Sequence, residues 1–100
     1  MGVAIDSIVS QGSIISGGRV IHSILSPGVR VNSFCEIEDS ILMRNVIVGR
    51  NCRIRKAIID ADVIIPEQTE IGFDPDFDRE RGFTVTPSGI VVVKEFLVAQ

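Results

Sequence analysis

The only histidine of the chain, His22, offers the most direct route to acid–base chemistry. An imidazole titrates near neutral pH, so His22 could act as the general base of an acyltransferase. A zinc hydratase would need three histidine ligands, which a single histidine excludes. Because no long loop near His22 would shape a substrate pocket, the sequence favours a solvated histidine at a corner of the fold.

Two cysteines, Cys35 and Cys52, lie 17 residues apart and form a second candidate group. A metal or redox pair would use both thiols, but two ligands are too few for a structural zinc site. If the two side chains stack in parallel, their geometry disfavours a disulfide even at a suitable Cα spacing. We therefore expect two small apolar residues stacked in the interior.

Basic residues form a third group, and they fall at outward positions of the repeat described next. They are Arg30, Arg44, Arg50, Arg53, Arg55 and Lys56. Such a basic face could contact a neighbouring subunit or another domain. It could equally be a solvated face that covers the sheets, and the sequence leaves both interpretations open.

A repeat spaces all of these residues. The stretch SILSPGVRVNSFCEIED, residues 23–39, is followed at once by SILMRNVIVGRNCRIRK, residues 40–56. Aliphatic residues recur at intervals of 6, 6 and 5, which sum to 17, at Leu25, Val31, Ile37, Leu42, Val48, Ile54, Ile59, Ile65 and Ile71. A second column, two residues earlier at most of these positions, holds Val29, Cys35, Val46, Cys52, Val63 and Thr69. A looser first round begins at Ser7, one step of 16 before Ser23.

This repeat predicts short strands joined by corners. Two inward positions separated by one outward residue make a strand, and Gly or Asn between strands tolerates a sharp corner. A helix would need intervals of three and four, and an antiparallel sandwich would not hold a strict 17-residue register. Three strands and three corners close one coil, and coils stacked at about 4.8 Å form parallel sheets on three faces. The predicted fold is all-β: a left-handed parallel β-helix of hexapeptide-repeat type with about four coils. The period alone does not determine the handedness. The left hand is predicted because hexapeptide repeats of this type resemble the left-handed parallel β-helix, an exception to the usual right-handed crossover.

The chain divides into three predicted segments: a lead-in over 1–6, the β-helix over 7–72 and a capping tail over 73–100. Within the tail, Asp74 followed by Pro75 predicts the start of one short helical turn over 74–81. The stretch FTVT-PSG-IVVV then predicts a β-hairpin. Such a tail would cover one open end of the stack. The edge of the first coil stays uncovered, and an open strand edge predicts self-association.

Composition excludes several functions. The net charge is −3 with ten basic residues, which argues against a nucleic-acid partner. No apolar run is long enough to span a membrane, and no basic and apolar leader of the signal-peptide kind is present. Two cysteines without such a leader indicate a reducing compartment, so we expect a cytoplasmic protein.

Three stretches resemble one family in the same order. They are GVRVNSFCEIEDSIL, GRNCRIRKAIIDADVIIPEQTEIG and the tail DPDFDRERGFTVTPSGIVVV. Together they resemble the C-terminal domain of bacterial glucose-1-phosphate adenylyltransferase, also called ADP-glucose pyrophosphorylase. The resemblance implies a part of an enzyme that makes ADP-glucose and pyrophosphate from ATP and glucose 1-phosphate for glycogen biosynthesis. The catalytic domain of that family carries a Gly-rich phosphate loop and metal-binding carboxylates, and neither occurs here. We therefore expect no catalytic residue in this chain and no activity of the chain alone.

The resemblance also implies partners and sites. Mg and ATP would belong to the missing catalytic domain, and this domain would need no cofactor or metal. Its partners would be its own N-terminal catalytic domain, further copies in a homo-oligomer, and a phosphorylated metabolite effector. Arg79, Arg81 and Lys94 are the expected contacts for the effector phosphate, since Arg and Lys suit phosphate in charge and geometry. The alternatives are a stand-alone hexapeptide-repeat acyltransferase that uses His22, and a non-catalytic β-helix scaffold.

Overall fold

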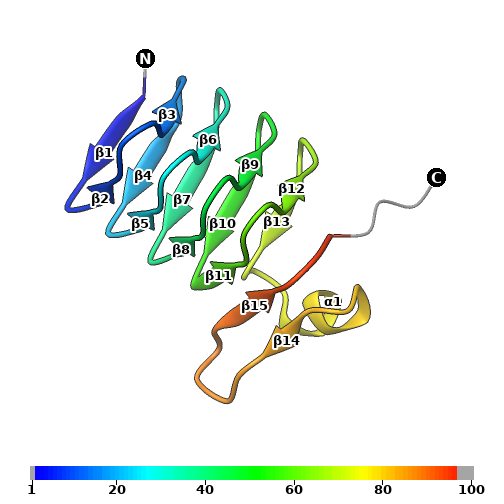
Figure 1. Cartoon of the computed structure of the whole chain (residues 1–100). Coiled ribbons are helices and arrows are strands. Elements are labelled where there is room, and N and C mark those ends of the chain that lie inside the picture. Colours follow the sequence, from blue (N-terminus) through cyan, green and yellow to red (C-terminus); the bar gives the residue numbers. More distant parts are fainter. Residues whose placement is uncertain (1, 97–100) are drawn as a thin grey trace.

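Three parallel sheets form the three sides of a prism (Figure 1). The structure is a computed structural model and describes residues 2–96. Sheet A contains, in spatial order, β1 (Val3–Ile5), β4 (Arg19–Ile21), β7 (Glu36–Glu38), β10 (Arg53–Arg55) and β13 (Glu70–Ile71). Sheet C contains β12 (Ile64–Ile65), β9 (Ile47–Val48), β6 (Arg30–Val31) and β3 (Ile14–Ile15). Each coil contributes one strand to each side, which confirms the predicted parallel β-helix.

Sheet B continues into the tail. It contains β14 (Thr84–Val85), β15 (Val91–Val93), β11 (Ala57–Ile59), β8 (Ile41–Leu42), β5 (Ile24–Leu25) and β2 (Ile8–Val9). The predicted hairpin is present, because β14 and β15 pair antiparallel. In addition, β15 pairs parallel with β11 and so adds a further level to the coil stack. The tail is thus part of the sheet as well as a cap.

The strand register explains the irregular first step of the repeat. In later coils the partners lie 17 residues apart, as in Arg53 with Glu70, whereas Val3 pairs with Arg19 at a step of 16. The first coil is one residue shorter at a single corner, the one that holds Gly17 and Gly18. A Cβ atom at Gly18 would lie 2.5 Å from the carbonyl oxygen of Cys35, so this corner has no room for a side chain. Because Val3–Ile5 pairs with β4, the stack begins within the segment predicted as a lead-in.

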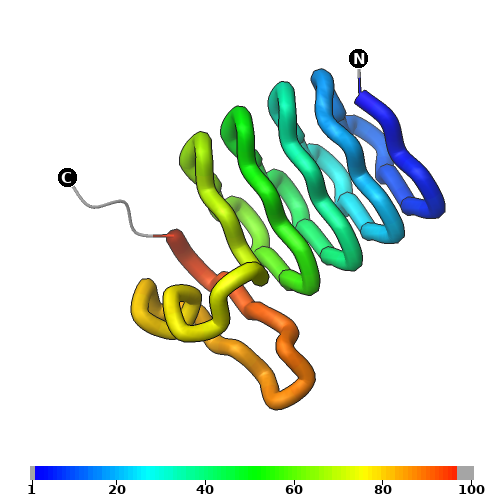
Figure 2. The backbone as a smooth tube through the Cα atoms, turned by 180° about the vertical axis from the view of Figure 1, so that it is seen from behind, coloured from blue at the N-terminus to red at the C-terminus, as the bar shows by residue number. Residues whose placement is uncertain are grey.

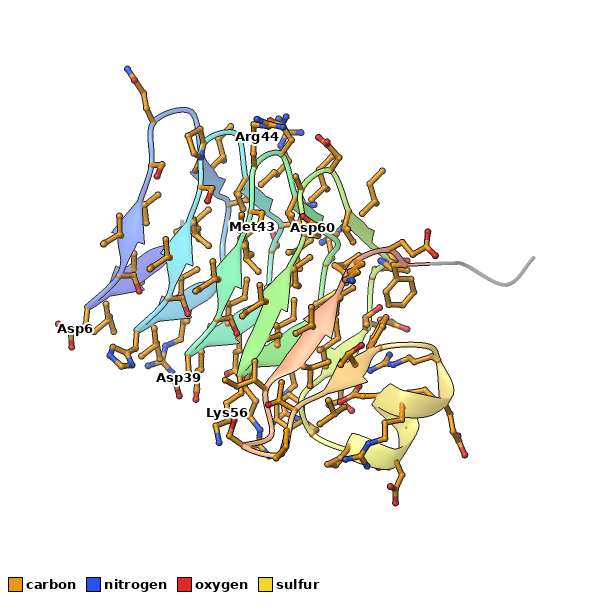
Figure 3. The ribbon with its side chains drawn as sticks, turned by 60° about the horizontal axis from the view of Figure 1, so that its bottom comes forward. Asp6, Asp39, Met43, Arg44, Lys56 and Asp60 are labelled. Carbon is orange, nitrogen blue, oxygen red and sulfur yellow. The ribbon has the colours of Figure 1, made fainter. Side chains whose placement is uncertain are left out.

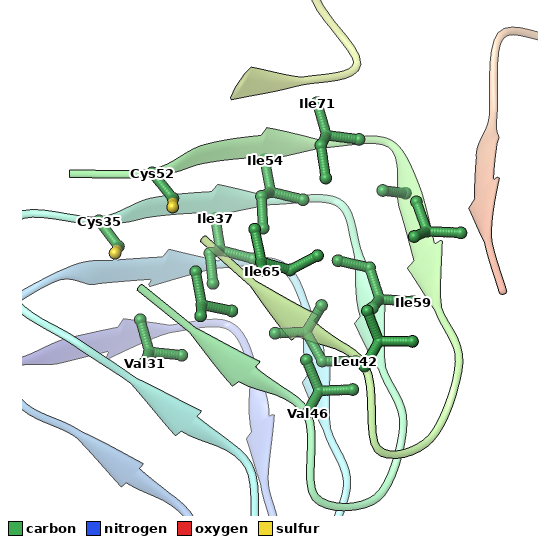
Figure 4. Packing of buried hydrophobic residues seen from close by; sticks show 14 of the residues in the cluster. Val31, Cys35, Ile37, Leu42, Val46, Cys52, Ile54, Ile59, Ile65 and Ile71 are labelled. Carbon is green, nitrogen blue, oxygen red and sulfur yellow. The ribbon is translucent and has the colours of Figure 1, made fainter. Parts of the chain in front are cut away.

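The core is the predicted pair of aliphatic columns (Figure 4). All nine positions of the first column are at most 1% exposed. The second column is buried as well, up to Thr69 at 8%. The coils therefore place these side chains on one shared axis, where those of the inner coils are covered by the coils on both sides.

A column of serine residues links successive coils through hydrogen bonds between side chains and backbone. The hydroxyl oxygen of Ser7 accepts a hydrogen bond from the Ser23 amide at 3.0 Å, and that of Ser23 accepts one from the Ser40 amide at 3.0 Å. The hydroxyl of Ser40 in turn accepts one from the Ala57 amide at 3.2 Å. The Ser23 and Ser40 hydroxyls donate to the carbonyl oxygens of Ile21 and Glu38. These buried polar groups are therefore satisfied, as buried polar groups must be.

At the corners, residues other than Gly and Asn also adopt the left-handed backbone conformation. One column of corners has φ between 47° and 51° at Asp6, His22, Asp39 and Lys56. A second column has positive φ at Gly12, Gly28, Asn45 and Asp62, and a third at Phe34, Asn51 and Gln68. A left-handed non-glycine residue costs roughly 1–2 kcal/mol. The regular register of the coils therefore overrides the local preference of residues such as Phe34 and Lys56.

The tail folds against the C-terminal end of the stack (Figure 2). Helix α1 (Pro75–Glu80) is the predicted helical turn. The Asp74 side chain accepts hydrogen bonds from the amides of Asp76 and Phe77 at 3.1 and 3.2 Å, which confirms the predicted N-cap. No helix among residues 2–96 is long and apolar enough to cross a membrane.

The first coil is open at the opposite end. Strands β1, β2 and β3 are the outermost strands of their sheets. Ala4 is exposed and Val9 is 40% exposed, whereas their partners in the next coil, Val20 and Leu25, are fully buried. This exposed edge is the feature from which self-association was predicted.

Candidate functional site

A groove at the C-terminal end of the stack has a volume of about 480 Å³. It lies between the corner that follows β11, strand β12 and the chain that follows β15. Its walls are Ala61, Asp62, Val63, Ile64, Pro66, Lys94, Glu95 and Phe96. The ring of Phe96 packs on that of Phe83, with centroids 5.6 Å apart, and so joins the two ends of the tail hairpin.

Lys94 is the one predicted phosphate contact that lines this groove. Its side chain is exposed, but Asp62 and Glu95 line the same groove. Two carboxylates beside one ammonium give the groove a net negative charge, which opposes an anion. A phosphate bound beside Lys94 would therefore need further basic groups from outside the described residues.

Arg81 has a structural partner within the chain. Its Nη2 atom lies 2.6 Å from Oδ1 of Asp78, and it also donates to the carbonyl oxygen of Glu70. The guanidinium stacks on the rings of Phe77 and Phe83, at 4.3 and 4.9 Å from their centroids. With 19% of its side chain exposed, Arg81 joins the helix of the tail to strand β13.

Arg79 lies at the surface in the last turn of α1. Its Nη1 atom is 3.2 Å from Oδ1 of Asp76, and 55% of its side chain is exposed. The three predicted phosphate contacts thus have three different settings: a surface ion pair, a buried ion pair and the wall of a groove. Their role toward phosphate stays a prediction.

The outward basic residues are exposed, as predicted. On sheet A, Arg53 lies 2.8 Å from Glu70 and 3.8 Å from Glu36, both of which are half exposed. Arg53 and Arg55 also stack on the ring of Phe73, each 4.3 Å from its centroid. This face alternates in charge from coil to coil, so among the described residues it resembles a solvated and charge-balanced face.

His22 lies at an exposed corner, as expected. Its Nδ1 atom is 2.7 Å from Oδ1 of Asp39, one coil further along, and 75% of its side chain is exposed. A carboxylate at this distance can orient a histidine that acts as a base. The adjoining hollow of about 220 Å³ is lined by Asp6, Ile8, His22, Ser23 and Ile24. The ring therefore stands in solvent rather than inside an enclosed site.

The two cysteines are free thiols stacked in the interior, as predicted. Cys35 Sγ donates to the carbonyl oxygen of Gly49 at 2.9 Å, and Cys52 Sγ to that of Pro66 at 3.0 Å. The neighbouring Cys52 thiol lowers the pKa of the Cys35 thiol to about 7, whereas the Cys35 thiol and burial raise the pKa of Cys52. Among residues 2–96, no three His, Cys, Asp or Glu side chains gather as a metal site would need.

We expect both thiols to react slowly with a thiol reagent in the folded protein. A lowered pKa favours the reactive thiolate of Cys35. The reagent cannot reach this side chain without local unfolding, because the side chain is only 1% exposed. The measurement is the rate of reaction with a chromogenic disulfide, with and without denaturant. Both thiols should react at once in denaturant and at least about tenfold more slowly in its absence. One fast thiol in the folded protein would contradict this.

The sequence analysis did not identify Asp62, Glu95 or Asp78 as members of these sites. Asp62 and Glu95 are more than thirty residues apart and meet only because β15 joins sheet B beside β11. Asp78 is one of several acidic residues in the stretch DPDFDRER. The only signal that could have singled it out is its spacing of three from Arg81, which places both on one face of a helix.

A sequence model of the family described as GlmU-like, C-terminal hexapeptide matches residues 1–93. The chain belongs to this family. The match covers every coil of the stack and both strands of the tail. It agrees with the period of six found in the sequence.

This GlmU-like hexapeptide domain is similar to proteins that carry the name glucose-1-phosphate adenylyltransferase. The chain is 59% identical over 93 residues to the protein of Koribacter versatilis, and the aligned region covers 93% of this chain and 22% of the relative. The chain is also 59% identical over 92 residues to the protein of Rhodopirellula baltica, and the aligned region covers 92% of this chain and 21% of the relative. The protein of Anaeromyxobacter sp. is 58% identical over 93 residues, with shares of 93% and 22%. The predicted resemblance is confirmed, and the chain spans about a fifth of the length of the curated relatives it matches.

Proposed function

We propose that this chain is the regulatory and oligomerising C-terminal domain of a glucose-1-phosphate adenylyltransferase. The observation that supports this most strongly is 59% identity over 93 residues to a protein of that name. The whole enzyme would make ADP-glucose and pyrophosphate from ATP and glucose 1-phosphate. In this proposal the Mg and ATP of that reaction belong to the N-terminal catalytic domain, and this domain contributes no catalytic residue.

The proposed role is indirect. A stiff stack of coils holds subunits together and presents a surface to the catalytic domain. A phosphorylated effector bound beside Lys94 would be completed by basic groups of that domain, because the groove alone carries two carboxylates against one lysine. An effector that bridges two domains stabilises one relative arrangement of them, and this is a coupling free energy between sites.

A chimera tests this proposal. The matching C-terminal fifth of the Koribacter versatilis relative is replaced by this chain, and ADP-glucose formation from ATP and glucose 1-phosphate is measured with and without phosphorylated metabolites. We expect an active chimera that responds to an effector, and no activity from this chain alone. A Lys94→Gln variant should weaken the response about tenfold, as expected for the loss of a charge-assisted contact to phosphate. An active chimera without any response would favour a scaffold, and an inactive, well-folded chimera would contradict the proposal.

A hexapeptide-repeat acyltransferase is the second candidate function. The observation that favours it is the His22–Asp39 pair at 2.7 Å, the arrangement of a base and its orienting carboxylate. The 75% exposure of His22 argues against it, because a general base normally acts in a site that excludes water. Acyl transfer from acyl-coenzyme A by the chain alone, lost in His22→Ala, would establish this function in place of the first.

A further inference from the structure

Strand β12 has an edge that no other strand covers among residues 2–96. It is the last strand of sheet C at the C-terminal end of the stack, because the order of that sheet is β12, β9, β6 and β3. At the same end, Asp78 and Arg81 of the tail form hydrogen bonds with the end of β13 in sheet A, and β15 extends sheet B. Sheet C is therefore the side of the prism that the described part of the tail leaves open.

An amide group without a described acceptor marks this edge. In each earlier coil, the first residue of the sheet C strand donates its amide to a carbonyl oxygen of the next coil. These pairs are Ile14 with Val29, Arg30 with Val46 and Ile47 with Val63. The equivalent donor in the last coil is Ile64, for which residues 2–96 supply no acceptor. A backbone amide at a strand edge is a template for the pairing of a further strand.

The groove of about 480 Å³ described above lies along this edge. Val63, Ile64 and Pro66, in β12 and its flanks, form one wall, and the chain over 94–96 forms the other. Ile64 is 61% exposed there. Because β15 forms the next level of sheet B, the groove lies where the next level of sheet C would be.

The chain that leaves β15 keeps the register of the coils. Ile59 pairs with Val93, two repeats of 17 residues further on. The Met43 amide donates to the carbonyl oxygen of Ile59 at 2.9 Å, and the Asp60 amide donates to that of Val93 at 2.9 Å. Met43 and Asp60 hold the same place in successive coils (Figure 3). Lys94 therefore begins the next corner of the same column.

In this register, the residues that follow Phe96 in the sequence correspond to β12 and its flanks. They lie outside the described residues, and the pairs are Leu97 with Val63, Val98 with Ile64, Ala99 with Ile65 and Gln100 with Pro66. Val63 and Ile65 are buried, whereas Ile64 between them is exposed. Leu97 and Ala99 thus fall at inward positions of the repeat and Val98 at an outward one, and all three are apolar. The segment continues the pattern of a coil strand.

We propose that the segment 97–100 pairs in parallel with β12 and adds one further strand to sheet C. The carbonyl oxygen of Leu97 then accepts the Ile64 amide, as that of Val63 accepts the Ile47 amide at 3.1 Å. Addition of a strand to an open edge gains main-chain hydrogen bonds together with contacts of alternate side chains. The Leu97 side chain covers the end of the buried column at Val63.

The chain's own segment is the occupant that the structure favours. Phe96 already lines the groove and is held by the ring of Phe83, so the segment starts beside the edge that it would cover. A tethered strand has an effective concentration that a separate peptide lacks. Once it is seated, the apolar part of the groove is filled, and the corner of Asp62, Lys94 and Glu95 is the part that stays open to a ligand.

Hydrogen exchange followed by NMR tests this pairing on the chain alone. The Ile64 amide should exchange at least about tenfold more slowly in the complete chain than in a chain that stops after Phe96. The Ile47 amide is the internal control, because its acceptor on Val63 is present in both chains. The inference does not rest on the enzyme assignment, which the chimera tests, so either can fail without the other.

Two substitutions test which side of the segment faces inward. Leu97→Glu places a charge against the buried column and should raise the exchange rate of the Ile64 amide to that of the shortened chain. The matched control, Val98→Glu, places the same charge at the outward position and should leave the rate close to that of the unsubstituted chain. Circular dichroism shows that each variant is folded.

Three results would overturn the proposal. The first is an equal exchange rate of the Ile64 amide in the complete and the shortened chain. The second is protection that increases with protein concentration, because another copy would then supply the strand. The third is protection that Val98→Glu removes and Leu97→Glu leaves intact, because the segment would then present its opposite side to the column.

Discussion

Replacement of Ile54 with alanine is expected to lower the free energy of unfolding by about 2–5 kcal/mol. Ile54 is 1% exposed and lies in register between Ile37 and Ile71, so its side chain is enclosed by the coils on both sides. The loss combines the transfer free energy of the deleted carbon atoms with the cavity that they leave. For a domain of ordinary stability, roughly 5–15 kcal/mol, this is a large fraction of the total. Urea unfolding followed by circular dichroism measures it.

The matched control is Ile64→Ala, on a strand of the same stack. Ile64 is 61% exposed on the outer face of sheet C, so its truncation should change the free energy of unfolding by no more than about 0.5 kcal/mol. The two substitutions are chemically identical and differ only in the direction of the side chain. Equal effects at both positions would show that Ile54 does not face a shared core, and the β-helix itself would then be wrong.

The coil stack could be predicted because its information is local and repeated. The same side chain type returns at the same position of every coil, so a period read from Leu25 onward already defines the inward column and the outward face. The one-residue irregularity before Arg19 was visible in the sequence as a step of 16. The sequence did not show that the missing residue lies at the corner of Gly17 and Gly18, because any corner of the first coil could have been the short one.

The candidate sites were less predictable because they depend on contacts between distant segments. Lys94 meets Asp62 only after β15 has joined sheet B. The outward aliphatic residues of sheet B show the same limit. Ile24 and Ile41 were simply outward residues in the sequence, and they became neighbours on one surface once the strand register aligned them. A short-range pattern therefore defines the coil, whereas the partners of the tail are set by the way it folds back.

The second prediction concerns the ion pair that holds the tail to the stack. Asp78 is 1% exposed, accepts hydrogen bonds from the Gly72 amide at 3.1 Å and from Arg81 at 2.6 Å, and so joins α1 to the end of β13. Removal of one partner of a buried ion pair leaves the other charge without compensation and costs about 3–5 kcal/mol. Asp78→Ala should therefore destabilise the tail by about this amount. Hydrogen exchange of the β14 and β15 amides measures it.

The control for Asp78→Ala is Asp76→Ala, two residues earlier in the same helix. Asp76 is 92% exposed and pairs with Arg79 at the surface, where an ion pair contributes about 0–1 kcal/mol. A second comparison separates the lost charge from the lost packing: the double variant Asp78→Leu, Arg81→Met replaces the pair with apolar groups and should recover much of the stability. If Asp78→Ala released the tail no more than Asp76→Ala did, the tail would be held to the stack by the pairing of β15 with β11 instead. The inner coils should stay protected in either case, because their buried residues from Leu25 to Ile54 are covered by neighbouring coils.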